Sequence, residues 1–152
     1  MRFFLIFILV VSFSFAFDFS IFPKAKNGEI MQILELAPLE NEDEKLVKIE
    51  FGKNLELDCN SYFFTDGNLT NQNLKGFGYE YYKFKAKGLL AGTLMYCGDG
   101  VKKEKFVKFE PEIYKKYSSK LPFVFYTPKD VKVKYSIFSL EKSEILDQKA
   151  KY

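Results

Sequence analysis

Apolar and polar residues alternate along much of this chain, and this two-residue period constrains the fold more than any other feature of the sequence. Val47, Ile49 and Phe51 would share one side of an extended segment, with Lys48 and Glu50 on the other. Such alternation is typical of a β-strand with one buried face. Comparable alternating or apolar runs occupy residues 30–36, 55–59, 77–84, 121–126 and 131–137.

Turn-forming residues separate these runs. They stand at residues 52–54, 66–68, 98–100 and 127–130. Several short strands joined by such turns predict an all-β fold, an antiparallel sandwich or barrel. A short helix is expected only near residues 110–116, and the polar tail from Glu141 onward is expected to be loose. The sequence contains no internal repeat or linker, so a single domain is expected.

The first sixteen residues are expected to be a signal peptide rather than part of the fold. Met1 and Arg2 precede an unbroken apolar run at residues 3–11, and Ser14 and Ala16 supply the small residues of a cleavage site. A membrane anchor is the alternative, but the run is too short to span a bilayer comfortably. We therefore expect residues 1–16 to be removed by cleavage. Residues 17–152 would then form a single periplasmic domain without a membrane segment.

The chain has two cysteines and no histidine. In an oxidising compartment Cys59 and Cys97 are expected to form a structural disulfide. That bond would close a loop of about 39 residues, a constraint on the unfolded chain worth roughly 4 kcal/mol. Without histidine, Ser-His and Cys-His catalytic arrangements and most zinc sites are excluded, and neither a metal nor a cofactor is expected. A Ser-Lys arrangement at Ser139 and Lys142 is the enzymatic alternative, but its companion motifs are missing.

Charged residues are interspersed along the chain, with a formal net charge of +3. The densest basic run, at residues 102–105, is interrupted by Glu104 and is interpreted as a solvated face. We therefore expect no nucleic-acid partner. Asn68 and Thr70 form a glycosylation sequon with Asp66 two residues before it, a pattern that some bacteria modify in the periplasm. A plain turn is the alternative interpretation of that segment.

Several segments, taken in order, resemble the ecotin family of periplasmic serine protease inhibitors. They are Leu-Glu-Leu-Asp-Cys-Asn at 55–60, Gly-Phe-Gly-Tyr-Glu-Tyr-Tyr at 76–82, Thr-Leu-Met-Tyr-Cys-Gly-Asp-Gly at 93–100, and the C-terminal matches at 119–128 and 133–135. The similarity extends from about Phe22 to Ile145 and aligns both cysteines. It implies a dimeric antiparallel β-sandwich in which the C-terminal strand, here Val131 to Leu140, crosses to the partner subunit. The sequence alone favours an ordinary edge strand within one chain.

The resemblance also implies a loop that inhibits chymotrypsin-, elastase- and trypsin-type proteases reversibly by imitating a substrate. The reactive loop would comprise Ala91, Gly92, Thr93, Leu94, Met95 and Tyr96, with the Leu94-Met95 bond at the protease nucleophile. Asn60, Cys59 and Cys97 would support this loop, and Ser61, Tyr62 and Phe63 would flank it. Leu94 stands where the family commonly has Met, which predicts good inhibition of chymotrypsin- and elastase-like enzymes and weaker inhibition of trypsin. Gly92 could loosen the loop, because glycine is conformationally permissive.

A secondary protease contact from the other subunit is implied as well. The matching residues are Phe77, Gly78, Tyr79, Glu80, Lys116, Lys120 and Leu121, and the stretch at 109–116 is two residues shorter than usual in the family. The alternative function is an envelope β-sandwich, ligand-binding or structural, that has lost inhibitory activity.

Overall fold

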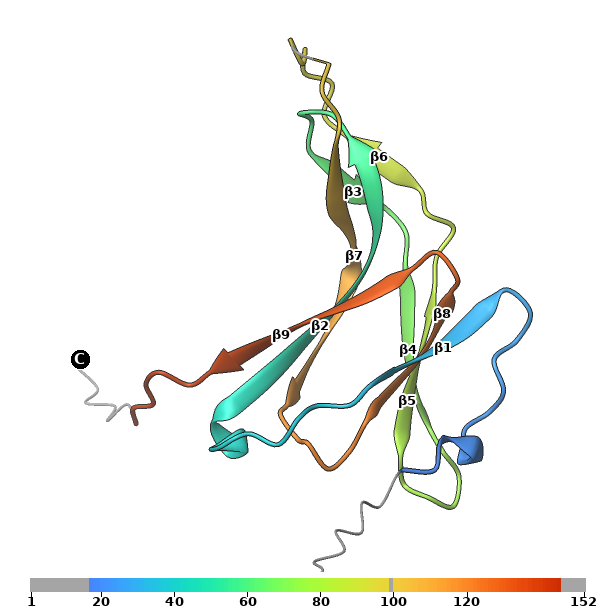
Figure 1. Ribbon diagram of the computed structural model, residues 1–152, viewed down its shortest axis with the longest axis vertical. Coiled ribbons are helices and arrows are strands. Elements are labelled where there is room, and N and C mark those ends of the chain that lie inside the picture. Colours follow the sequence, from blue (N-terminus) through green and yellow to red (C-terminus); the bar gives the residue numbers. More distant parts are fainter. Residues whose placement is uncertain (1–16, 99, 146–152) are drawn as a thin grey trace, which may run out of the picture.

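The computed structural model describes residues 17–98 and 100–145, so the expected signal peptide at residues 1–16 lies outside the described residues. The elements, in chain order, are η1 Phe19–Ile21, β1 Glu29–Leu34, η2 Glu42–Glu44, β2 Lys45–Leu57, β3 Tyr62–Phe64, β4 Asn68–Asn73, β5 Glu80–Lys85, β6 Leu90–Gly92, β7 Lys103–Lys116, β8 Phe123–Pro128 and β9 Lys132–Ser139 (Figure 1). Apart from two short 3-10 turns, every described element is a strand. The predicted all-β fold is therefore confirmed.

The strands form two main sheets and one short ribbon. The larger sheet has the order β1-β8-β5-β4, the second has the order β7-β2-β9, and β3 pairs with β6. All pairs are antiparallel except β5 with β8, which run parallel. The two main sheets pack face to face over a shared hydrophobic core, as expected of a sandwich.

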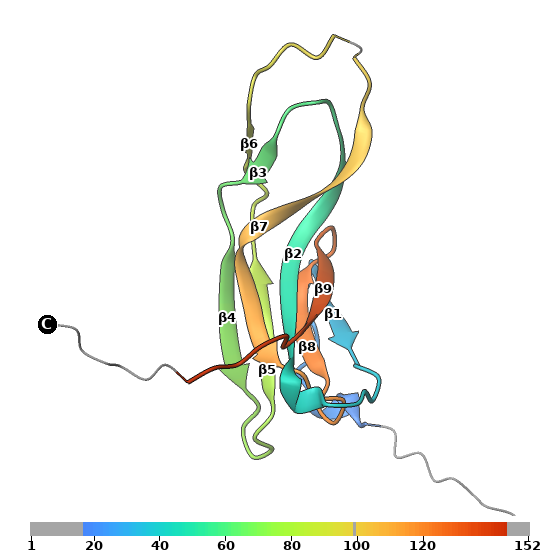
Figure 2. The ribbon, with the colours of Figure 1, turned by 90° about the vertical axis from the view of Figure 1, so that its left-hand side faces the viewer.

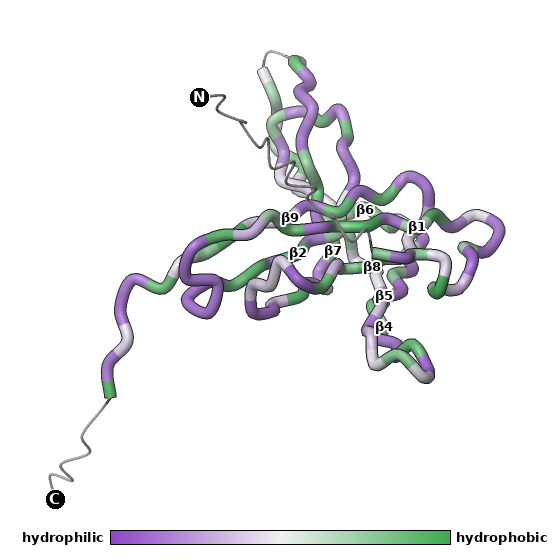
Figure 3. Tube along the Cα trace, turned by 60° about the horizontal axis from the view of Figure 1, so that its bottom comes forward, coloured by the Kyte–Doolittle hydropathy of each residue, from purple (hydrophilic) through white to green (hydrophobic). Residues whose placement is uncertain are grey.

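The predicted alternation in β2 decides which residues enter that core. Val47, Ile49 and Phe51 are fully buried. The ring of Phe51 stacks on Phe84 of β5 at 4.6 Å between centroids and meets Phe125 of β8 edge-on at 5.7 Å. Hydropathy alternates along much of the strands in Figure 3. β8 is the exception, because it is buried on both faces, with Phe125 in the main core and Val124 and Tyr126 in a second cluster.

The turn expected at residues 52–54 is wrong, because β2 continues through it as one strand. Gly52 is buried, and a Cβ there would lie 2.4 Å from a ring atom of Phe106 and 2.5 Å from the carbonyl oxygen of Val107. The pairing with β7 shifts register between Glu50 and Gly52. This glycine therefore permits the close approach of β7 at a bulge and does not end the strand.

The helix expected near residues 110–116 is also wrong, because this segment belongs to β7. Ile113 stands opposite Ile49, and Glu112 stands opposite Glu50, in the ladder with β2. Proline has no backbone N–H to donate to a neighbouring strand. This is tolerated at Pro111, because β7 is an edge strand and Pro111 lies at its bulge. Pairing with a long neighbour outweighs local helix propensity here.

The long strands β2 and β7 rise above the sandwich and carry β3, β6 and the segment between β6 and β7 at one end of the molecule (Figures 1 and 2). The turn between β4 and β5 lies at the opposite end in both views. β9 pairs with β2 of the same chain, with Tyr135 opposite Ile49 and Ile137 opposite Val47. Exchange of this strand between two copies stays a prediction. Among the described residues, no helix is long and apolar enough to cross a bilayer.

Candidate functional site

The segment that joins β6 to β7 presents apolar side chains to solvent. Leu94 is completely exposed at 101%, Tyr96 is 93% exposed and Met95 is 57% exposed. These three neighbours belong to the segment between β6 and β7, which extends at one end of the molecule, away from both main sheets (Figure 2). A contiguous exposed apolar run of this kind is a candidate interaction site.

A short ladder fixes the chain up to the residue before Leu94. β6 pairs with β3, with Gly92 opposite Tyr62. Beyond β6 the pairing continues, because Thr93 N donates to the carbonyl of Ser61 at 3.0 Å. The hydroxyl oxygen of Thr93 in turn accepts from Ser61 N at 3.1 Å. Leu94 therefore follows directly on hydrogen-bonded backbone.

Asn60 fixes the chain on both sides of Leu94. Its side chain is largely buried, with a residue exposure of 5%. Its Oδ1 accepts from Met95 N at 2.6 Å and from the Thr93 hydroxyl at 2.8 Å. Its Nδ2 donates to the Met95 carbonyl at 3.1 Å. One amide group thus holds both the backbone N–H and the backbone carbonyl of Met95. Leu94 projects between two anchored residues, Thr93 and Met95.

Asn60 is itself held by Asp58, a residue that sequence reasoning did not assign to the site. The Asp58 carboxylate accepts from Asn60 N at 2.9 Å and from Asn60 Nδ2 at 3.1 Å. These bonds, the backbone one foremost, lower the pKa of Asp58 below its usual value. Lys105 adds two contacts, donating from Nζ to the carbonyls of Asp58 at 2.6 Å and Asn60 at 3.2 Å. An Asp two residues before an Asn, as in an Asx turn, was the available sequence signal.

The predicted disulfide between Cys59 and Cys97 is present. The two Cα atoms lie 5.7 Å apart, a common separation for a disulfide. Cys59 N also donates to the Cys97 sulfur at 3.2 Å. The bond covalently ties the loop two residues beyond Met95 to the residue that precedes Asn60.

Gly92, which was expected to loosen the loop, packs closely against its neighbours. A Cβ at this position would lie 2.6 Å from Cδ1 of Tyr62 and 2.9 Å from the carbonyl oxygen of Ser61. The Tyr62 ring is held over the glycine because its hydroxyl donates to Asp58 at 3.0 Å. The absence of a side chain at Gly92 therefore lets the flanking tyrosine cover the loop backbone.

The other predicted flanking residues are accessible beside the loop. Phe63 is 56% exposed, whereas its neighbour Phe64 is buried in the core. Ser61 is exposed too. Phe63 is therefore outside the core and accessible for contact with a partner.

Asp66, the acidic residue of the sequon, anchors the chain that leads into β6. Its carboxylate accepts from the backbone N–H groups of Lys87, Gly88 at 3.1 Å and Leu89 at 2.8 Å. Asn68 is exposed and begins the edge strand β4 rather than lying in a plain turn. The acidic residue of the sequon is therefore already committed to holding the chain that leads into β6.

The two segments predicted for a secondary contact come together at the opposite end of the molecule from Leu94 (Figure 1). Phe77 and Lys120 line a cavity of about 540 Å³, and Gly78, Glu80 and Leu121 line an adjoining cavity of about 310 Å³. Tyr79 lines both. Lys116 lines neither and stands at the end of β7, opposite Leu46.

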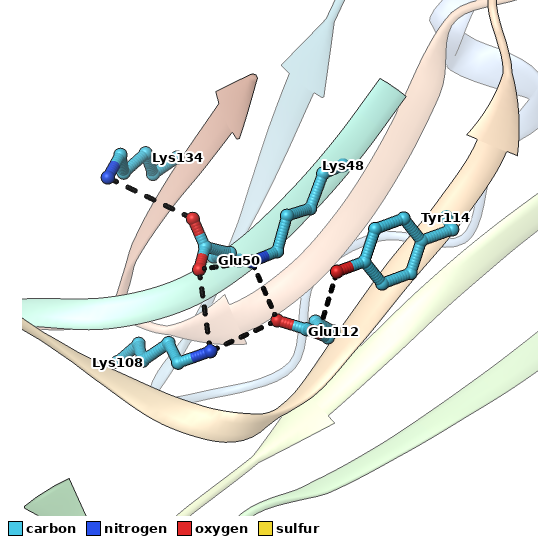
Figure 4. Close-up of polar contacts among 6 residues, drawn as sticks. All are labelled: Lys48, Glu50, Lys108, Glu112, Tyr114 and Lys134. Carbon is cyan, nitrogen blue, oxygen red and sulfur yellow. Dashed lines mark hydrogen bonds and ion pairs between the residues drawn. The ribbon is translucent and has the colours of Figure 1, made fainter. Parts of the chain in front are cut away.

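An ionic cluster on the solvent face of β2, β7 and β9 was not predicted (Figure 4). We define the cluster as Lys48, Glu50, Lys108, Glu112, Tyr114 and Lys134. Lys48 Nζ lies 3.0 Å from Glu50 and 3.1 Å from Glu112, and Tyr114 donates to Glu112 at 2.9 Å. Tyr114 first and then Lys48 lower the pKa of Glu112 to about 2.

The described part of the chain holds no group of three or more His, Cys, Asp or Glu residues suited to a metal ion.

Comparisons with known proteins agree with the resemblance of the motifs. The ecotin family profile matches residues 18–140 of this chain. An ecotin of Serratia proteamaculans is 37% identical over 122 residues, which cover 79% of this chain and 71% of that protein. Ecotins of Pseudomonas fluorescens and Pseudomonas putida are 39% and 38% identical over 123 residues, covering 80% of this chain and 77% of each relative.

Proposed function

Because this chain belongs to the ecotin family, whose members inhibit serine proteases and are not enzymes, we propose that it is a reversible, substrate-like inhibitor of chymotrypsin-fold serine proteases. The reactive bond is Leu94-Met95. The observation that carries this proposal is the grip of Asn60 on both polar groups of Met95 beside a fully exposed Leu94.

The arrangement explains how a substrate-shaped loop can inhibit. Leu94 enters the primary specificity pocket, and the protease serine attacks the Leu94 carbonyl. If the bond breaks, the Leu94 acyl group stays on the serine and Met95 N becomes the departing amine. That nitrogen is the atom that Asn60 Oδ1 holds at 2.6 Å. Because the disulfide also tethers the Met95 side of the cut, the amine remains in place to re-form the bond rather than leaving.

Rigidity also contributes to affinity. A loop that already has its bound shape loses little conformational entropy on binding. The Thr93–Ser61 bonds, the Asn60 amide and the Cys59–Cys97 bond restrain the loop before the protease arrives. Substrate peptides lack such restraint, and they dissociate once cut.

The chemistry of Leu94 sets the preferred enzymes. Its apolar side chain suits the hydrophobic pocket of chymotrypsin-like enzymes and the small pocket of elastase-like enzymes. A trypsin-like pocket has a carboxylate at its base, which leucine leaves unpaired and desolvated. We therefore propose weaker inhibition of trypsin, with contacts elsewhere preserving part of the affinity.

Two copies of the chain would act together through β9. Tyr135 and Ile137 lie on the same side of the sheet as the buried Val47 and Ile49, yet they are 48% and 42% exposed. Phe138 and Leu140 are 50% and 56% exposed near the end of the strand. A second copy that exchanges β9 would cover these side chains and pair the strand at the same position on β2.

A dimer would also bring the secondary contact to the protease. Tyr79 lines both cavities and lies just before β5. Within one chain, the turn between β4 and β5 lies at the opposite end from the segment between β6 and β7 (Figure 2). One protease therefore meets the loop of one subunit and the secondary contact of the other. Two linked contacts raise affinity through effective concentration. Export by the signal peptide places this inhibitor in the periplasm.

Titration tests the proposal. Purified mature chain, residues 17–152, is added to chymotrypsin and to leukocyte-type elastase at concentrations near the expected stoichiometry. Activity is expected to fall to zero at one reactive loop per protease. Leu94→Asp should abolish inhibition, since a carboxylate cannot enter an apolar pocket without a large desolvation cost. Full protease activity, or rapid complete cleavage of the Leu94-Met95 bond, would contradict the proposal.

A further inference from the structure

Phe17, where the described chain begins, packs at the end of the molecule that carries the proposed secondary contact. Its ring meets Tyr79 edge-on, with 5.2 Å between ring centroids. It also lies 4.9 Å from the ring of Phe19 and 6.3 Å from that of Phe22. Of these four residues, only Tyr79 belongs to the secondary contact predicted from the sequence, and Phe17, Phe19 and Phe22 were not assigned to any site.

A second hydrophobic cluster fixes the segment at residues 17–22 in place. Phe22 is buried against Tyr81, Val124 and Tyr126, on the face of the four-stranded sheet that points away from the main core. The Tyr126 hydroxyl donates to the carbonyl of Pro23. The segment is therefore anchored behind Phe17, so the ring has a defined position beside Tyr79.

Phe17 and Tyr79 stand between the two cavities described above. Both cavities are lined by Phe17, Tyr79 and Pro122. Phe77 lines the larger cavity and Leu121 lines the smaller one, and these two side chains are 56% and 52% exposed. The two rings form an aromatic ridge, and residues of the predicted contact flank it on both sides.

We propose that Phe17 is a further residue of the secondary protease contact, where it acts with Tyr79 as a single aromatic ridge against the protease surface. This inference rests on the proposed function and adds the mature N-terminal segment to its binding surface. Aromatic anchors contribute strongly at interfaces because they bury a large area at a small cost in side-chain entropy. Asp18, Glu35 and Lys120 surround the larger cavity, so the ridge has the polar rim typical of interface centres. The matching protease surface is apolar at its centre and polar around it.

The first test measures inhibition constants for chymotrypsin with the mature chain and its variants. Phe17→Ala is expected to raise the inhibition constant about tenfold, as for loss of one aromatic anchor. Phe17→Trp is expected to keep it within about threefold, because an aromatic ring remains on the ridge. The double variant with Tyr79→Ala should show less than the product of the two single effects, since the rings act together. Leu39→Ala, a change of an exposed apolar residue outside both proposed contacts, should leave the constant unchanged.

The second test distinguishes direct contact from support of Tyr79. With p-benzoylphenylalanine at position 17, irradiation of the complex is expected to crosslink the inhibitor to the protease. This readout does not depend on how well Phe17→Ala folds. If wild-type chain inhibits but Phe17→Ala has an unchanged constant or no crosslink forms, the inference is overturned. If the wild-type chain does not inhibit at all, the proposed function itself is wrong.

Discussion

The side-chain amide of Asn60 spans the peptide group of Met95, accepting from its N–H at 2.6 Å and donating to its carbonyl at 3.1 Å. The two bonds have opposite polarity, so a single planar amide satisfies both. A carboxylate could accept from the N–H but could not donate to the carbonyl, and a hydroxyl could not reach both. The position therefore has a chemical requirement that asparagine meets.

Replacement of Asn60 is expected to make the loop behave more like an ordinary substrate, with weaker inhibition and faster cleavage. Asn60→Ala removes the bonds to Met95 and Thr93, each worth about 1 kcal/mol. The inhibition constant for chymotrypsin should rise by a factor of ten or more, roughly tenfold per 1.4 kcal/mol lost. Mass spectrometry should show faster cleavage at Leu94-Met95, because the new amine is no longer held. Asn54→Ala is the matched control, since within the described residues the Asn54 side chain bonds only to Glu104, and the inhibition constant of this variant should not change.

Adding a methyl group at Gly92 is expected to destabilise the loop. The new Cβ of Gly92→Ala would meet the Tyr62 ring at 2.6 Å, so the ring must leave its position. Overpacking of this kind costs about 1–3 kcal/mol, measurable as a lower midpoint in urea. At Gly98, where the nearest atom to an added Cβ is on the Tyr96 ring at 3.7 Å, alanine should have little effect. Equal midpoints for the two variants would show that the Tyr62 packing does not matter.

Removing the disulfide is expected to weaken inhibition more than it weakens the fold. The double variant Cys59→Ser and Cys97→Ser loses a cross-link expected to contribute about 2–4 kcal/mol. The two main sheets do not include either residue, so near-native circular dichroism is expected at low temperature. Inhibition should weaken more than the fold does, because the bond restrains the chain just beyond Met95. A variant with native inhibition constants would mean that the hydrogen bonds suffice to hold the loop.

Acid should weaken the fold through Glu112. In the folded chain, the Tyr114 hydroxyl and Lys48 lower the pKa of Glu112 from 4.5 to about 2. Because the folded pKa is below the unfolded one, the ionised carboxylate stabilises the fold fully above about pH 4.5, and this contribution is lost as pH falls toward 2. Melting temperatures between pH 5 and 2 should therefore decline less steeply for Glu112→Gln than for the wild type. Glu110→Gln, a change at an exposed residue on the same strand, should keep the wild-type slope.

Strand β2 was predictable from the sequence where its side chains alternate. The prediction failed at Gly52, because that glycine is explained by packing against another strand. Val47 to Phe51 carry their own signal in the sequence. Gly52 has the appearance of a turn, yet it is required by Phe106, which lies far along the chain in the paired strand. The segment at 110–116 likewise takes its extended form from pairing with β2, which no local window contains.

The candidate site, too, was predictable from the sequence only in part. The disulfide followed from the cysteine count and the expected compartment, and the exposed loop followed from family motifs. The support of Asn60 by Lys105 did not, because it depends on the position of β7. Asp58 is a local partner, two residues before Asn60, and its Asx-turn spacing was the only signal for that support. The ionic cluster also joins residues from three strands, and each of its lysines has the sequence appearance of an ordinary surface residue.

Exchanging the side chain at Leu94 should redirect the inhibitor between protease classes. Its side chain is fully exposed and belongs to neither hydrophobic cluster of the described residues, so Leu94→Arg should leave the melting temperature unchanged. In a trypsin-like pocket the guanidinium would pair with the carboxylate at its base, a charge-assisted interaction that leucine cannot make. The inhibition constant for trypsin should fall by about tenfold or more, while that for elastase should rise by at least as much. If both constants stay at wild-type values, position 94 does not enter the specificity pocket, and another residue of the loop must do so.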